Sequence, residues 1–158
     1  MQNTPNFHYC YLGAIGWDHP AWNGAFYPDD MPSEWRLNYY NTLFECVYFP
    51  YTLWQSVAPE TLEKWHADTL DSFRFVFEPA PDAAASDTSR LNALGDKAIV
   101  ADPQSGPSLL WLKPDTQIKP LAQSLQALEQ ATPIYLISTS GNLAQLEQAR
   151  TLLEVMGF

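Results

Sequence analysis

The sequence predicts an α/β fold built on about six mainly parallel strands. Short apolar runs bounded by turn residues alternate with helical patterns at both ends of the chain, as α/β architecture requires. Most of these runs are continuously apolar rather than alternating, which is typical of parallel strands covered on both faces. The chain has 158 residues, 46% of them apolar, which suits a single domain over residues 1–158 with a substantial core.

Each predicted strand is a run of four to seven mostly apolar residues. The two cysteines, Cys10 and Cys46, lie inside the first two runs, so we interpret them as reduced core thiols rather than as a disulfide or a thiolate metal site. The predicted strands are Tyr9–Ile15, Leu43–Phe49, Phe73–Phe77, Ala98–Ala101, Leu109–Leu112 and Ile134–Ile137.

Helical patterns occupy the segments between these runs. The first two begin with proline and an early glutamate, which is a helix start signal, and the last two place leucine and alanine on one stripe. Residues 79–90 are rich in Pro, Ala, Asp and Ser and show no such periodicity, so they are interpreted as a loop or seam within the domain. The predicted helices are Pro32–Asn41, Pro59–Ala67, Arg90–Leu94, Pro120–Ala131 and Leu143–Met156, the last capped by Ser140 or Asn142.

The chain is acidic, with a formal net charge of −10. Residues 1–71 hold nine acidic and two basic residues, and no basic stripe occurs, which disfavours nucleic-acid binding. No apolar run approaches the ~20 residues of a membrane helix, and the polar N-terminus shows no signal-peptide pattern. We therefore expect a cytoplasmic protein that does not bind a membrane. The histidines lack metal-ligand spacing, so neither a metal nor a cofactor is predicted.

Residues 13–28, GAIGWDHPAWNGAFYP, form the most distinctive stretch of the chain. A strand that ends in Gly16-Trp17 and is followed by Trp22 and by Phe26-Tyr27-Pro28 resembles the opening of the YecE-like family, also called domain of unknown function 72. The next segments of this chain also resemble the segments that follow in that family. They are Glu34-Trp35 through Tyr39-Tyr40, Phe44-x-x-Val47, Val57 to Trp65 and Phe73–Val76.

The resemblance continues more weakly through residues 98–103, 109–113 and 134–142, but the family's fourth and fifth βα units have no counterpart across Ala80–Leu94. The family fold is a TIM-type (β/α)₈ barrel, which takes about 250 residues. The resemblance thus implies a shortened TIM-barrel-like (β/α) fold, in which six strands either close more tightly or leave the cylinder open. An open α/β sheet is the alternative.

Several positions at the carboxyl ends of the strands differ from the family pattern. By the resemblance, Tyr48 and Pro50 stand where the family has Glu and Asn, Glu78 where it has Lys, Trp111 and Lys113 where it has Arg and His, and Ser138-Thr139 where it has an Asn pair. A tyrosine cannot act as a carboxylate base at neutral pH, and a glutamate in place of a lysine repels an anion.

Candidate site residues gather in the first loop. Asp18 and His19 are candidate catalytic residues, because a carboxylate beside an imidazole can transfer protons, and Asp102, which ends a strand, is a third. A role in turns is the alternative for all three. Candidate ligand-binding residues are Trp17, Trp22, Tyr27, Tyr48 and Glu78. Aromatic rings with acidic groups suit sugars, but a role of the rings in the core or at an interface is the favoured interpretation.

The family's Glu, Asn, Lys, Arg and His groups at the carboxyl ends of the strands are replaced in this chain, and two βα units are missing. These losses favour a non-catalytic remnant that acts through protein–protein interaction or self-association. Exposed strand edges would be covered by a homodimer or by another protein. One alternative is a residual hydrolase-like or small-ligand site that uses Trp17, Asp18, His19 and Asp102. A carbohydrate-binding surface is the other.

Overall fold

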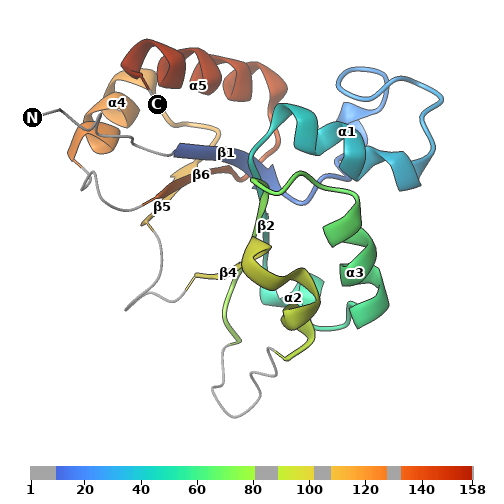
Figure 1. Ribbon diagram of the computed structural model, residues 1–158. Coiled ribbons are helices and arrows are strands. Elements are labelled where there is room, and N and C mark those ends of the chain that lie inside the picture. Colours follow the sequence, from blue (N-terminus) through green and yellow to red (C-terminus); the bar gives the residue numbers. More distant parts are fainter. Residues whose placement is uncertain (1–9, 81–88, 102–107, 128–132, 158) are drawn as a thin grey trace, which may run out of the picture.

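Six parallel strands form one curled sheet with helices packed along its outer face (Figure 1). The computed structural model describes residues 10–80, 89–101, 108–127 and 133–157. The prediction of an α/β fold with about six mainly parallel strands is confirmed, in the order β4-β3-β2-β1-β6-β5. The strands are β1 (Cys10–Ile15), β2 (Cys46–Phe49), β3 (Arg74–Phe77), β4 (Ala98–Val100), β5 (Ser108–Leu112) and β6 (Ile134–Ser138).

This strand order is that of a (β/α) barrel opened between β4 and β5. A barrel keeps consecutive strands side by side and returns the last strand to the first. Here β6 pairs with β1, whereas β4 and β5 are the two ends of the sheet, with no ladder between them in the described residues. Seven residues, 101–107, separate β4 from β5, which is fewer than the ~10–12 that a crossover between adjacent parallel strands needs. The molecule is therefore a half-barrel rather than a tighter six-stranded cylinder.

The helices follow strands along the chain and lie outside the curl of the sheet (Figure 1). The longest, α5, follows the last strand, and its Asn142 Oδ1 accepts a hydrogen bond from the Gln145 N–H at 3.0 Å, so Asn142 rather than Ser140 is the N-cap. The helices are α1 (Arg36–Leu43), α2 (Tyr51–Trp54), α3 (Pro59–Ala67), α4 (Ile118–Ala127) and α5 (Leu143–Met156), with 3₁₀ turns η1 (Pro20–Trp22), η2 (Ser33–Trp35) and η4 (Ser89–Lys97).

Two of the predicted helices, Pro59–Ala67 and Leu143–Met156, are confirmed at both ends. The second predicted strand is wrong at its start: Leu43 completes α1, the Phe44 N–H donates to the Tyr40 carbonyl at 2.9 Å, and β2 begins at Cys46. The apolar pattern gives no signal for α2, because four residues are too few to display a helical period.

The remaining predicted helices are confirmed in position but not in extent. Pro32–Asn41 begins as a 3₁₀ turn and continues as α1 to Leu43. Arg90–Leu94 belongs to the longer η4, which Gly95 interrupts at a φ of 57°. Pro120–Ala131 begins earlier, at Ile118, and its predicted end lies outside the described residues, as does 81–88 of the predicted seam.

Side-chain alternation divides the apolar residues between two layers. Leu12, Val47 and Phe75 belong to the large outer cluster, which the helices complete. A separate inner cluster on the concave face includes Tyr48 and Tyr135. Both faces of the sheet are therefore apolar, which is the physical reason for the continuously apolar strand sequences.

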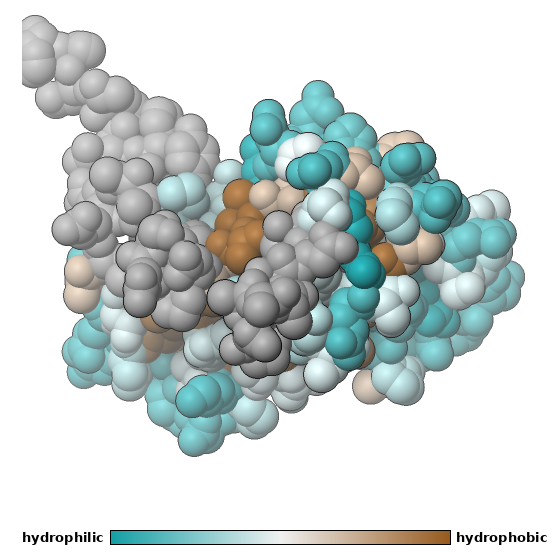
Figure 2. All heavy atoms as spheres, turned by 90° about the horizontal axis from the view of Figure 1, so that it is seen from below, coloured by the Kyte–Doolittle hydropathy of each residue, from teal (hydrophilic) through white to brown (hydrophobic). Residues whose placement is uncertain are grey.

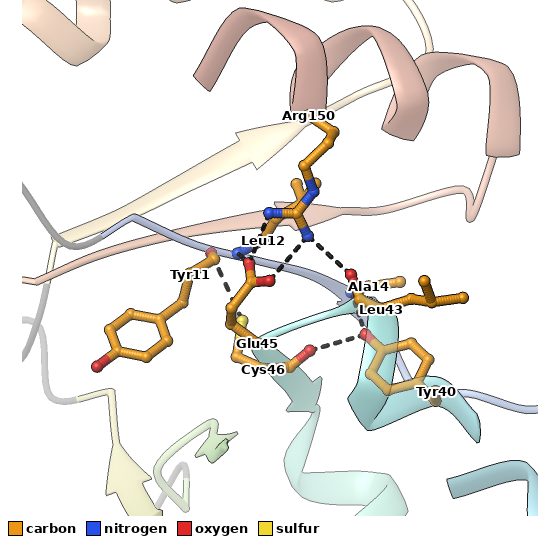
Figure 3. Close-up of polar contacts among 8 residues, drawn as sticks. All are labelled: Tyr11, Leu12, Ala14, Tyr40, Leu43, Glu45, Cys46 and Arg150. Carbon is orange, nitrogen blue, oxygen red and sulfur yellow. Dashed lines mark hydrogen bonds and ion pairs between the residues drawn. The ribbon is translucent and has the colours of Figure 1, made fainter. Parts of the chain in front are cut away.

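A cluster of charged side chains, Arg150 of α5 and Glu45 just before β2, connects α5 to the sheet (Figure 3). Arg150 donates from Nη1 to Glu45 Oε1 at 3.0 Å and from Nη2 to Oε2 at 2.9 Å, and Nη2 also donates to the Leu43 carbonyl at 2.8 Å. Glu45 Oε1 in turn accepts the Leu12 N–H at 3.0 Å. The two-point contact between a guanidinium and a carboxylate fixes the orientation of α5 over the sheet.

Buried phenols and thiols make the folded state sensitive to alkaline pH. Burial is the largest cause of a pKa of about 12 for both Tyr48 and Cys10, above their ordinary values of 10.0 and 9.0. Burial also raises the pKa of four further groups above their ordinary values, those of Tyr27, Tyr40, Cys46 and Tyr135.

We expect the stability of the protein to fall steeply between about pH 9 and pH 12. Over this range the unfolded chain loses protons that the folded chain retains, so the free energy of unfolding decreases as pH rises. Urea unfolding at a series of pH values measures the effect, and the absorbance of tyrosinate reports ionisation directly. A free energy that stayed constant through pH 11 would contradict the expectation, since it would mean that the phenols ionise within the folded state.

Candidate functional site

The loop after β1 carries Asp18 and His19 at the carboxyl edge of the sheet, but the two side chains have different partners. Asp18 is exposed and accepts a hydrogen bond from Arg36 Nη1 at 3.0 Å. The His19 ring lies 4.3 Å from the Trp22 ring and packs on Gly141, where an added Cβ would lie 2.6 Å from His19 Nδ1. No hydrogen bond joins Asp18 to His19 within the described ranges, so they do not form a proton-transfer pair in this arrangement.

Three candidate aromatic residues anchor this loop. The Tyr27 hydroxyl donates to the Trp17 carbonyl at 2.7 Å, and Trp22 Nε1 donates to the Gly141 carbonyl, also at 2.7 Å. Trp22 and Tyr27 are each 1% exposed, and Trp17 is 9% exposed. Trp22 and Tyr27 therefore belong to the core and do not offer ring faces to a sugar, whereas Trp17 contacts the cleft described next.

A cleft of about 390 Å³ opens beside this loop and brings Trp17, Asp18 and His19 together in one lining. Residues from three other elements complete it. They include Phe49 at the end of β2, Leu53 of α2 and Trp65 of α3. Sequence reasoning missed these three as site residues, because an apolar side chain at a strand end or on a helix has the same pattern in a core as in a cleft.

A second feature, the pair of Tyr48 and Trp111, lies on the concave face. These rings contact edge to face, with centroids 4.9 Å apart and an interplanar angle of 86°, although β1 and β6 separate their strands in the sheet. Tyr48 is 6% exposed, and burial, followed by the nearby Glu78 charge, raises its pKa to about 12. The phenol is therefore protonated at neutral pH and cannot serve as a general base.

Two further rim side chains that depart from the family pattern, those of Glu78 and Ser138, also have internal partners. Glu78 Oε1 accepts the Tyr51 N–H at 2.8 Å at the start of α2, so it stabilises that helix end. Ser138 is fully buried, and its Oγ accepts the Gly141 N–H at 3.0 Å. The Lys113 carbonyl accepts from Gln145 Nε2 at 2.6 Å.

Asp102, the third catalytic candidate, lies outside the described residues. In the part of the chain that is described, no three His, Cys, Asp or Glu side chains gather closely enough to hold a metal ion. None of the helices described is both long and apolar enough to cross a bilayer.

Comparison with known proteins gives one family and two solved structures. The family model described as "Protein of unknown function DUF72" matches residues 11–82. A DUF72 family protein from Thermotoga maritima superposes with a TM-score of 0.64 at 11% identity, covering 93% of this chain and 100% of that one. Another from Enterococcus faecalis gives 0.59 at 10% identity, covering 97% and 99%. No curated protein sequence matches the chain. At these identities the structural likeness shows a shared fold.

Proposed function

We propose that this chain, whose residues 11–82 match the DUF72 family model, is a non-catalytic member of that family that acts by self-association through the open side of its half-barrel. The observation that carries the proposal is the pair of unpaired, uncharged edge strands, β4 and β5. The alternatives raised by the sequence, a residual hydrolase-like site and a carbohydrate-binding surface, have less support from the rim.

The rim supports a non-catalytic role because three of its side chains that depart from the family pattern, Tyr48, Trp111 and Glu78, make internal contacts. The positions that the resemblance gives as Glu and Arg in the family hold Tyr48 and Trp111, which pack on each other across the concave face. The position given as Lys holds Glu78, which is bonded to the backbone of α2. Among the described residues, the Tyr48 and Trp111 rings cover part of the inner face at positions where the family pattern has an acid and a cation.

The edge strands support an association surface. The sequence of β4 is AIV and that of β5 is SLLWL, so neither contains a charge or a proline. Edge strands of monomeric proteins usually carry such residues, because they block pairing with another chain. All three residues of β4 are partly exposed, and Trp111 of β5 is 36% exposed. Within the described residues these two strands lack a partner on their outer side.

A second copy of the chain fits this surface better than an unrelated partner, because one chain offers both complementary edges. The strands β4 and β5 run in the same direction at opposite ends of one curled sheet. A twofold axis along the barrel axis sets β5 of each copy beside β4 of the other in parallel. Both edges of both copies are then covered, and the assembly is closed.

We expect the wild-type protein to be a dimer at micromolar concentration and Trp111→Lys to be a monomer. A lysine on the inner side of an edge strand prevents close approach of a second sheet. Analytical ultracentrifugation or native mass spectrometry measures the stoichiometry. Val155→Lys is the matched control, because Val155 is 79% exposed on α5 and the substitution adds the same charge away from the edges. Circular dichroism must show that each variant is folded.

The variant Ile99→Lys tests the arrangement of the strands from the β4 side. If β5 pairs with β4, both edge variants dissociate the dimer, whereas dissociation by Trp111→Lys alone indicates β5 pairing with itself. Two copies that each carry a net charge of −10 repel, so added salt should strengthen the dimer. A wild-type protein that is monomeric at all concentrations and salt levels would contradict the proposal.

A further inference from the structure

Residues 23 and 24 form the one Asn-Gly pair of the sequence, in the loop between β1 and α1 (Figure 1). Both residues are exposed to solvent. An asparagine followed by glycine is prone to deamidation, because glycine has no side chain that would keep its peptide nitrogen away from the neighbouring amide. The Gly24 nitrogen loses its proton to hydroxide and attacks Asn23 Cγ. The Cγ–Nδ2 bond then breaks, ammonia leaves with a proton from water, and a further water molecule opens the succinimide to aspartate or isoaspartate.

The backbone at Asn23 keeps the two reacting atoms apart. The five-membered succinimide ring closes only when Cβ and the next peptide nitrogen are nearly eclipsed about the Cα–C bond, which for an L-residue requires a ψ of about −120°. Asn23 has a φ of −68° and a ψ of 119°, so the Gly24 nitrogen is turned away from Asn23 Cβ. The reactive ψ also lies outside the main allowed regions of the backbone. The folded loop therefore holds the pair in an unreactive conformation.

Two hydrogen bonds maintain this conformation. The Gly24 N–H donates to the Tyr27 carbonyl at 2.8 Å, so the nitrogen that would attack already has a partner. Asn23 Oδ1 accepts from Arg36 Nη2 at 2.7 Å, and Arg36 Nη1 donates to Asp18 at 3.0 Å. Because the Arg36 side chain is only 20% exposed and is held at two points, it restrains the Asn23 amide. The rotation of ψ that the reaction needs would separate the Gly24 N–H from Tyr27.

The turn at residues 22–27 requires this labile pair. Gly24 has a φ of 80°, and a Cβ there would lie 2.3 Å from Asp29 Oδ1, so a larger residue would be strained and would clash. The Trp22 carbonyl accepts the Tyr27 N–H at 2.9 Å, and both side chains are 1% exposed in the core. Isoaspartate at position 23 would add a methylene group to the main chain inside this turn and would disturb the anchoring of both core residues.

We propose that Asn23 is a latent deamidation site, which the folded loop protects through Arg36 and Tyr27 and which reacts when the loop opens. The modification is a lasting record of opening, because the isoaspartyl turn cannot close as before. Polar groups provide the protection, and the apolar residues that Figure 2 shows among hydrophilic ones take no part in it. The inference involves neither edge strand, so it stands or falls separately from self-association.

The direct test follows deamidation of the full-length wild-type protein in one mildly alkaline buffer, both folded and unfolded by guanidinium. Intact mass spectrometry measures the replacement of NH₂ by OH, and peptide mapping assigns the residue and separates aspartate from isoaspartate. We expect Asn23 to react about a hundredfold more slowly in the folded protein, because the loop must first break both hydrogen bonds. Equal rates in the folded and unfolded protein would overturn the proposal.

Variants assign the protection to Arg36. Arg36→Met keeps the aliphatic part of the side chain and loses the donors, so deamidation of the folded protein should become about tenfold faster. The matched control is Arg74→Met, whose guanidinium donates to the Asp71 and Phe73 carbonyls at the start of β3, at the opposite edge of the parallel sheet. This control should react at the wild-type rate, and in Asn23→Ser the mass change should disappear.

The variants can also overturn the proposal. An unchanged or slower rate in folded Arg36→Met would show that the guanidinium does not protect the amide. A mass change that persists in Asn23→Ser would place the reaction at another residue. If circular dichroism shows that Arg36→Met does not fold, hydrogen exchange at the Gly24 amide of the wild type decides. Exchange as fast as in the unfolded chain would mean that the loop is not held closed.

Discussion

Tyr40→Phe is expected to lower the free energy of unfolding by about 2–4 kcal/mol, although it removes a single oxygen atom. The Tyr40 hydroxyl lies between β1 and β2, where it accepts the Ala14 N–H at 2.9 Å and donates to the Cys46 carbonyl at 2.7 Å (Figure 3). Tyr40, Ala14 and Cys46 are all 0% exposed, so water cannot replace the lost oxygen. The substitution leaves one buried donor and one buried acceptor without this partner.

The matched control for this variant is Tyr39→Phe, at the adjacent position of α1. The Tyr39 ring is partly buried and packs against Phe26 and Tyr27, so its substitution should change stability by less than about 0.5 kcal/mol. Guanidinium unfolding followed by circular dichroism measures both variants. Equal stability of Tyr40→Phe and the wild type would mean that the two strands close on each other once the hydroxyl is gone.

Gly13→Ala is expected to cost about 3 kcal/mol or more, because there is no room for a methyl group at this point of the β1–β2 contact. A Cβ on Gly13 would lie 2.0 Å from the Cys46 carbonyl oxygen and 2.9 Å from its Sγ. That oxygen is the one that accepts the hydrogen bond from Tyr40. The strands would have to separate, which would weaken the Tyr40 bridge as well, so the two variants should not be additive.

Gly157→Ala is the control for the loss of a glycine as such. Gly157, which follows α5, has a left-handed backbone with a φ of 86° and a ψ of 22° and no atom within 4 Å of an added Cβ, so alanine there costs only the backbone strain of about 1 kcal/mol. Repeating Gly13→Ala in a Cys46→Ala background separates the two contacts. Rescue in that background would assign the clash to sulfur, whereas we expect none, because the closer contact is with the backbone.

These two predictions depend on contacts that no sequence pattern displays. Tyr40 and Gly13 lie 27 positions apart in the sequence, and an aromatic residue in a helix that precedes a strand is ordinarily interpreted as core. The contact of Tyr48 with Trp111 is of the same kind, since it crosses two intervening strands. The curvature of the sheet brings such residues together, and curvature is not encoded in any local window of the sequence.

The candidate site was predictable in part. The loop motif and its position after a strand locate Trp17, Asp18 and His19 at the carboxyl edge, where the cleft is found. The sequence does not reveal that Asp18 and His19 have separate partners, because the direction of a loop side chain depends on what packs around it. Nor does it reveal that α3 contributes Trp65 to the cleft, because helix-to-loop contacts follow from the packing of the whole layer.

By itself the sequence determined the class of fold, the number of strands and two helices to the residue. Each of these follows from local properties: apolar period, proline and glutamate at helix starts, and the short span of residues between elements. Only the tertiary structure decided that six strands leave the barrel open between β4 and β5 and that Tyr48 faces Trp111. It also formed the cleft beside Asp18. The physical reason is that strand closure and side-chain contact depend on distances between segments that are remote in the chain.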